Sequence, residues 1–345
     1  MDILINLLQG GWNGLISYLS AHVLTCLVPA LFIAGAIAAF VSQAAILKYF
    51  GPQAKKVVSY SVASVSGAIL AVCSCTVLPL FAGIYKKGAG LGPAIAFLYS
   101  GPAINVLAIV YTARLLGYDI GLARAIGAIA FSVIVGLIMA FIYRKEKSQA
   151  DAQAFALLAA DPAGKSIWQQ VLFIGSLVGV LVFAASKNWI VMGIFLAAMA
   201  VILWRWFTKD EIIQWLKETL HFTRLIIPWL LLGVFIAGIL TVVIPPNVVA
   251  TWVGGNSISA NFIASFAGAL MYFATLTEVP IVKAFMELGM GKGPALTLLL
   301  AGPALSLPAM FTLTKIMGFK KMITYVSLVV VMATITGYVF GLIVA

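Results

Sequence analysis

Hydrophobic residues run through nearly the whole chain in long stretches, and polar residues collect in the short segments between them. A helix that spans a membrane needs about 20 mostly apolar residues. The segments of approximately this length are 16–42, 57–85, 92–113, 120–143, 167–185, 189–206, 223–244, 258–285, 293–314 and 321–344. We therefore predict an all-α polytopic membrane protein with about 8–10 transmembrane segments.

The composition agrees with a chain that lies in a lipid bilayer. Hydrophobic residues make up 63% of the sequence and charged residues 9%, whereas about a quarter of a soluble domain is charged. The net charge of +11 would suggest nucleic acid as the partner of a soluble protein. In a membrane protein, the excess of basic residues in cytoplasmic loops explains it, so we expect no nucleic-acid partner.

Two parts of the chain repeat one pattern of prolines and glycines. Pro79 and Pro280, Pro93 and Pro294, and Gly101-Pro102-Ala103 and Gly302-Pro303-Ala304 all share an offset of 201 residues (280 − 79, 294 − 93, 302 − 101). We therefore predict two related halves, a first transmembrane repeat over 1–143 and a second over 223–345. Inverted repeats with broken helices at the midplane are a recurrent transporter design.

The region between the repeats, 144–222, is predicted to hold a solvated linker, two transmembrane helices and a surface helix. The linker starts with the charged run Arg144-Lys145-Glu146-Lys147. Thr208 and Glu211 have the spacing of a capping box. The apolar residues that follow lie on one face, which predicts an amphipathic helix at 205–222 on the membrane surface.

Charge indicates how the two repeats are oriented. The loop at 43–56 holds Lys48, Lys55 and Lys56, whereas its counterpart at 245–257 holds no charge. The positive-inside rule then places the two loops on opposite sides of the membrane, so we expect inverted halves, with a parallel repeat as the alternative. Inversion requires one segment per half to be re-entrant or divided, and breaks at Gly101-Pro102 and Gly302-Pro303 would provide this.

The segment Cys73-Ser74-Cys75-Thr76-Val77-Leu78-Pro79 carries the most distinctive candidate chemistry. Pro79 cannot donate a backbone hydrogen bond, and its ring clashes with the carbonyl four residues earlier, that of Cys75. On unwound backbone, Cys73 and Cys75 would lie on one side and could bind a soft ion such as Cu(I), Zn(II) or trivalent arsenic. The alternative is that both are small core residues, which is also how we interpret the isolated Cys26.

Glu278 precedes Pro280 at the equivalent place in the second half. An ionisable residue within a membrane span is costly and is a functional candidate by default. Apolar surroundings penalise its charged form, so Glu278 could carry a proton or bind a cationic substrate. The alternative is a salt bridge with Lys283 or a position near the interface.

Four polar residues beside the breaks complete the candidate site. Asn105 and Ser306 end the two Gly-Pro-Ala motifs and would either line the site or hydrogen-bond between helices. Thr76 and Thr277 are equivalent, and either hydroxyl could satisfy backbone groups that the breaks leave free.

The run CSCTVLPLFAGIYKKGAGLGPAIAFLYSGPAIN and the run TEVPIVKAFMELGMGKGPALTLLLAGPALSLP resemble the predicted-permease family that includes the organoarsenical efflux permeases. The resemblance implies export of trivalent methylated or aromatic arsenicals through the bacterial cytoplasmic membrane, without a cofactor. The family's cysteine pair falls on Cys73 and Cys75, and its acidic residue before proline falls on Glu278. A homodimer remains open.

The residues and the resemblance together favour a secondary exporter. A Walker A motif is lacking in the sequence, which gives no support to ATP hydrolysis by this chain. Efflux of copper or zinc by the same fold is one alternative, although two histidines leave a four-coordinate zinc site short of ligands. A membrane thiol–disulfide oxidoreductase using Cys73 and Cys75 is the alternative of a different class.

Overall fold

The structure is a computed structural model and describes residues 2–20, 27–40, 55–70, 74–144, 167–186, 188–243, 252–271 and 278–344. Over these ranges the chain forms helices and no strands, apart from one isolated bridge between Gly254 and Met290. The helices are α1 (Asp2–Tyr18), α2 (Val28–Phe40), α4 (Lys56–Leu70), α5 (Ser74–Lys86), α6 (Leu91–Ala103), α7 (Val106–Leu116), α8 (Tyr118–Ile142), α10 (Ile167–Ala185), α11 (Trp189–Trp206), α12 (Lys209–Val243), α14 (Ile258–Leu270), α15 (Glu278–Glu287), α16 (Lys292–Ala301), α17 (Leu307–Met317) and α18 (Phe319–Val344).

This architecture confirms the all-α polytopic class. Within the described residues, four helices, α8, α11, α12 and α18, are long and apolar enough to cross a membrane. The bent pair α6–α7 adds a fifth if its two helices, inclined by 47°, count as one span. Several other apolar segments that the hydropathy pattern joins into single spans hold two helices over the described residues. The segment 57–85, for example, contains α4 and α5, and 258–285 contains α14 and most of α15.

The offset of 201 residues also relates the helices to one another. Helices α6, α7 and α8 begin at residues 91, 106 and 118, and α16, α17 and α18 begin at 292, 307 and 319. Gly88 and Gly117, which have positive φ, correspond to Gly289 and Gly318, which also have positive φ. The packing repeats as well, because α6 lies between α4 and α8 just as α16 lies between α14 and α18.

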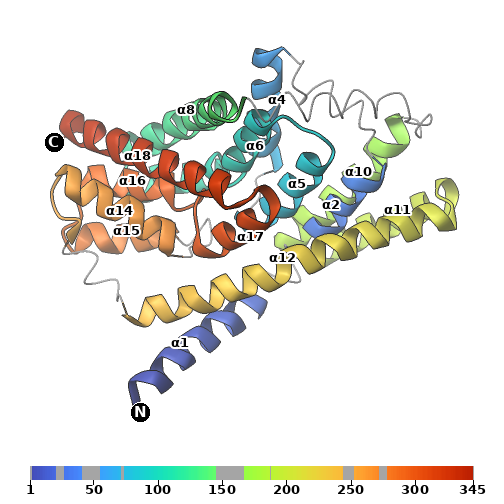
Figure 1. The fold of residues 1–345 in the computed structure, drawn as a ribbon, viewed down its shortest axis with the longest axis horizontal. Helices are drawn as coiled ribbons and strands as arrows, with labels where there is room; N and C mark the ends of the chain where they lie inside the picture. The colour runs from blue at the N-terminus through green and yellow to red at the C-terminus, as the bar shows by residue number, and fades with distance from the viewer. Residues whose placement is uncertain are drawn as a thin grey trace.

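The equivalent helices α8 and α18 lie side by side and run antiparallel (Figure 1). The hydroxyl of Tyr143, at the end of α8, is 2.9 Å from that of Thr324, near the start of α18. At the other end, Asp119 of α8 pairs with Lys292, and the neighbouring Gly293 packs against Gly337 late in α18. Two equivalent helices that run antiparallel are related by an axis perpendicular to their length.

Close helix contacts at glycine define each half. A Cβ at Gly136 of α8 would lie 2.7 Å from the carbonyl oxygen of Gly92 in α6, and 2.8 Å from the ring of Tyr60. The equivalent Gly337 would place a Cβ 2.7 Å from the carbonyl oxygen of Gly293. Small residues let helix backbones approach in membranes, where water supplies no hydrophobic force between helices.

The amphipathic segment is not a separate surface helix, which corrects the sequence prediction. Residues 209–243 form one helix, α12, about 52 Å long at 1.5 Å per residue. Trp215 of α12 is 4% exposed, and its indole Nε1 donates to the carbonyl of Phe32 in α2 at 2.9 Å. The apolar face is therefore partly covered by protein rather than by lipid. The predicted capping box is present, because the Thr208 amide donates to Glu211 and the Glu211 amide donates to Thr208.

The breaks after α6 and α16 differ slightly from the prediction. In the first half α6 continues through Gly101-Pro102 and ends at Ala103, whereas α16 ends at Ala301, directly before Gly302-Pro303. Proline interferes with backbone bonds on its N-terminal side and at its own nitrogen. A helix can consequently continue for a residue or two beyond a proline in its last turn.

We predict that the Gly136→Ala substitution lowers the free energy of unfolding by about 1–3 kcal/mol, because the added methyl group overpacks α8 against α6. Gly175→Ala in α10 is the matched control. Among the described residues, no atom outside its own helix backbone lies within 4 Å of a Cβ at Gly175, so this change should be neutral or stabilising by up to ~1 kcal/mol. Thermal unfolding in detergent measures both. Equal effects of the two substitutions would contradict the packing described for α6 and α8.

Candidate functional site

A buried ion pair connects the two halves of the protein. Glu278 is the first residue of α15, and its Oε1 accepts a hydrogen bond from Nη2 of Arg124 in α8. Both side chains are 0% exposed. Nη1 of Arg124 also donates to the hydroxyl of Thr112 in α7, at 2.8 Å. The Thr112 hydroxyl in turn donates to the carbonyl of Ala108, at 2.7 Å. The guanidinium of Arg124 therefore connects α15 with α7 and α8.

The pair is not saturated with hydrogen bonds. Within the described part of the chain, Nε of Arg124 and Oε2 of Glu278 have no hydrogen-bond partner, although both atoms are buried. A buried charge is tolerated when an opposite charge lies beside it, and losing that partner leaves the remaining charge uncompensated. Arg124 and Glu278 therefore depend on each other, and each retains one polar atom that could bind a further group.

Two buried tyrosines lie in the same interior region as this pair. Tyr99 of α6 interacts electrostatically with both Arg124 and Glu278, and its hydroxyl donates to the carbonyl of Leu300 at 2.9 Å. Tyr325 of α18 donates to the carbonyl of Ala304 at 3.2 Å. Tyr99 and Leu300 are themselves separated by 201 residues. A contact between a residue and its own repeat equivalent occurs at the axis that relates the halves, so the charged pair lies close to the centre of the molecule.

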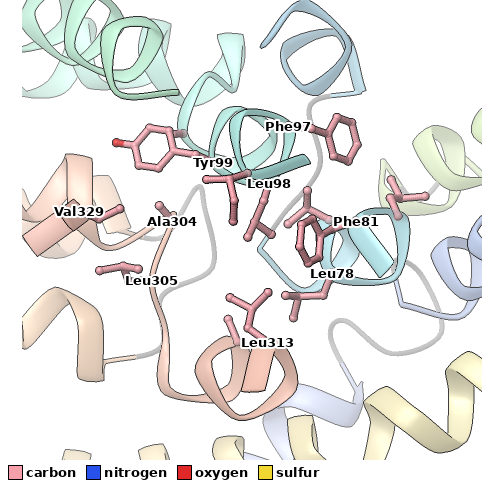
Figure 2. Close-up of a cluster of buried hydrophobic side chains, with 14 of the residues drawn as sticks. Leu78, Phe81, Phe97, Leu98, Tyr99, Ala304, Leu305, Leu313 and Val329 are labelled. Atoms are coloured by element: carbon pink, nitrogen blue, oxygen red, sulfur yellow. The ribbon is translucent and has the colours of Figure 1, made fainter. Parts of the chain in front are cut away.

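The region of the first half that corresponds to the ion pair is apolar. Figure 2 shows Leu78 and Phe81 of α5 close to Leu313 of α17, with Leu98 of α6 nearby. The contact of α5 with α17 corresponds to the contact of α15 with α7 at the offset of 201 residues. The two contacts thus join equivalent pairs of helices, but the first is lined by apolar side chains and the second lies beside the Arg124–Glu278 pair.

The sequence predicted Glu278 as a buried ionisable residue, and the structure places it in the interior as expected. The suggested partner Lys283 is wrong, because Lys283 is exposed and Arg124 takes the place beside the carboxylate. Sequence reasoning missed Arg124 altogether, along with Thr112. The rule that singles out Glu278, a charge within an apolar segment, applies equally to Arg124 inside 120–143.

Asn105 and Ser306 lie at equivalent places and perform the same local function. Oδ1 of Asn105 accepts from the amide of Ala108 at the start of α7, and Oγ of Ser306 accepts from the amide of Ala309 at the start of α17. Both distances are 3.3 Å. A side chain at this position satisfies one of the amides that a helix leaves free at its N-terminus. A contribution of either residue to substrate binding stays a prediction.

The cysteine motif lies at the start of α5. Cys75 is the second residue of this helix and Thr76 the third, and the Thr76 side chain is buried. Pro79 lies inside α5, which the structure describes from Ser74 to Lys86, so the helix continues through this proline. Cys26, Cys73 and Thr277 lie outside the described residues, as does the side chain of Cys75. The predicted soft-ligand site on Cys73 and Cys75 is therefore untested by the geometry.

These features together define a polytopic helical membrane protein built on matched half-helices around a buried charge pair. The model of the predicted permease family (ArsP_1) matches residues 10–342, so the chain belongs to this family. It is similar to the UPF0718 protein MJ0584 of Methanocaldococcus jannaschii, with 47% identity over 364 residues that cover 99% of this chain and 98% of the relative. The UPF0718 protein YraQ of Escherichia coli K12 is 25% identical over 267 residues, 77% of this chain and 63% of that protein. No solved structure matches.

We predict that Arg124→Leu and Glu278→Leu each lower the free energy of unfolding by about 3–5 kcal/mol, because each leaves one buried charge without its partner. The double variant Arg124→Leu/Glu278→Leu should recover most of this loss, since apolar residues of similar volume can replace a buried pair. Chemical or thermal unfolding in detergent gives the comparison.

The matched control for this cycle is Lys292→Gln, which removes the Asp119–Lys292 pair. The side chains of Lys292 and Asp119 are 47% and 34% exposed, and exposed pairs contribute about 0–1 kcal/mol to the free energy of unfolding. A double variant whose loss of stability equals the sum of the two single losses would show that Arg124 and Glu278 are not energetically coupled.

Proposed function

We propose that this permease exports a soft, thiol-reactive substrate, with trivalent organoarsenicals as the best candidates, across the cytoplasmic membrane by alternating access. Family membership supports a membrane permease. The observation that carries the finer proposal is the placement of Cys75 and Glu278 in the first turns of α5 and α15. These two helices occupy equivalent positions in the two repeats, with a soft ligand type on one and a carboxylate on the other.

The helix starts suit the chemistry that we assign to these residues. The first turn of a helix carries the positive end of the helix dipole, which stabilises a thiolate or a carboxylate placed there. A thiolate is the form of cysteine that binds soft metals and metalloids. We therefore assign substrate binding to Cys73 and Cys75, with Thr76, Asn105, Thr277 and Ser306 as further candidates around them.

The relation between the halves supports alternating access. Helices α8 and α18 both meet the length and hydropathy of membrane spans. Since they are equivalent and antiparallel, an axis that relates them would lie in the membrane plane, as it does in inverted repeats. Rocking of such halves about a shared centre exposes a site alternately to the two sides. We assign proton coupling to Glu278, the carboxylate at that centre.

We expect the Cys73→Ser/Cys75→Ser double variant to lose accumulation of methylarsenite in everted membrane vesicles, falling to the level of vesicles without the protein. The physical reason is that a hydroxyl group is a poor ligand for a soft metalloid. Cys26→Ser is the control and should retain flux. Silver or copper(I) ions, tested in the same vesicles, separate a metal-ion substrate from an arsenical one.

The same preparation distinguishes a transporter from a thiol–disulfide oxidoreductase. Loss of flux in the double variant, with no thiol–disulfide turnover in the parent, supports transport. Undiminished methylarsenite accumulation by the double variant would refute the assignment of the cysteines. Turnover of a dithiol substrate without flux would favour the enzyme.

For Glu278→Gln we predict that a pH gradient no longer accelerates flux, because an amide cannot exchange a proton with either side of the membrane. Binding should persist, measured as the shift in melting temperature of purified protein with methylarsenite. The opposite result, a flux that still responds to the pH gradient, would remove Glu278 from the coupling mechanism.

A further inference from the structure

The protein contains an internal control for the role of its buried charges. At the offset of 201 residues, Thr112 corresponds to Leu313, Arg124 to Tyr325, and Glu278 to Val77. Leu313, Tyr325 and Val77 are all buried, with exposures of 1%, 0% and 1%. Every member of the polar network is thus replaced by an uncharged residue at the equivalent position of the other half.

This comparison argues against a purely structural role for the ion pair. A buried pair often stabilises a fold no better than apolar residues of the same volume would. Here α5 packs against α17 through leucine and phenylalanine side chains. The equivalent contact of α15 with α7 has Arg124 and Glu278 beside it. Since the equivalent contact of α5 with α17 forms without charges, contact between these two helices does not by itself require Arg124 and Glu278.

The pair attaches a short helix to the body of the protein. Helix α15 has ten residues, packs against α7 and α16, and exposes Lys283 and Glu287 on its other side. The hydrogen bond from Arg124 to Glu278 is its connection to α8. Losing this bond would leave α15 with packing contacts of few buried side chains, and such segments open more easily than the rest of a structure.

The chemistry of the two groups makes this connection sensitive to protons. Arginine keeps its charge at all pH values relevant to a cell, whereas a carboxylate can bind a proton. When Glu278 binds one, Arg124 is left as a buried cation without a counter-ion, which is costly. The proton and the guanidinium therefore compete for one carboxylate.

We propose that Arg124 is the positioning residue for proton coupling: it holds Glu278 ionised and α15 docked, and protonation of Glu278 releases α15 from α8. Among the described residues, Arg124 of α8 is the charged group beside Glu278, and the buried tyrosines Tyr99 of α6 and Tyr325 of α18 are the titratable groups in the same region. Arg114 of α7 and Lys283 of α15 are exposed. This inference rests on the proposed function only for its link to transport, because the release of α15 is independent of the substrate.

Hydrogen exchange measured by mass spectrometry on the full-length protein in lipid nanodiscs tests the proposal. Exchange of α15 is compared with that of α5, the equivalent helix, from alkaline to acidic pH after correction for intrinsic rates. We expect acidification to accelerate exchange of α15 relative to α5 by about tenfold or more. Arg124→Gln and Glu278→Gln should each give fast exchange in α15 at every pH, and Arg124→Lys should restore the pH dependence.

Lys292→Gln is the matched control and should behave as the parent does. Identical pH responses of α15 and α5 in the parent protein would overturn the proposal, and so would a pH response that persists in Glu278→Gln. The parent comparison needs no variant, so it decides the matter even if a variant does not fold. Failure of methylarsenite flux in the parent would refute the proposed substrate while leaving this result intact.

Discussion

A charge in an apolar interior requires an opposite charge beside it, and the arrangement of this protein depends on one such requirement. Arg124 and Glu278 come from helices in different halves, and both are completely buried. Neither could remain charged in that place without the other. The pair therefore fixes the position of α15 relative to α8 at the centre, next to the Tyr99–Leu300 contact that joins equivalent positions of the repeat.

The second constraint is the need to satisfy backbone groups at the ends of helices that begin or end within long apolar segments. Lipid offers no hydrogen bonds, so these groups must find partners within the protein. Asn105 and Ser306 meet this need at equivalent positions, each accepting from the amide three residues later. Duplication thus preserves the backbone solution in both halves, whereas the side chains around α5 and α15 have diverged into an apolar and a charged version.

The sequence predicts the helical class, the offset of the repeat and the burial of Glu278, because hydropathy, proline spacing and the cost of a buried charge are local properties. It does not predict the partner of Glu278, since Arg124 is 154 residues away and nothing in a single sequence brings the two together. The continuity of α12 also escaped prediction. The polar residues near 209–222 resemble a surface helix until Trp215 is seen to pack against α2.

Infrared difference spectroscopy of the carboxyl group of Glu278, with Glu278→Gln as the reference, reports whether Arg124 keeps this side chain ionised. We expect an ionised carboxylate at neutral pH in the parent protein and a protonated carboxylic acid in Arg124→Gln. A protonated Glu278 in the parent at neutral pH, or an ionised one after removal of Arg124, would contradict the mutual dependence of the two charges.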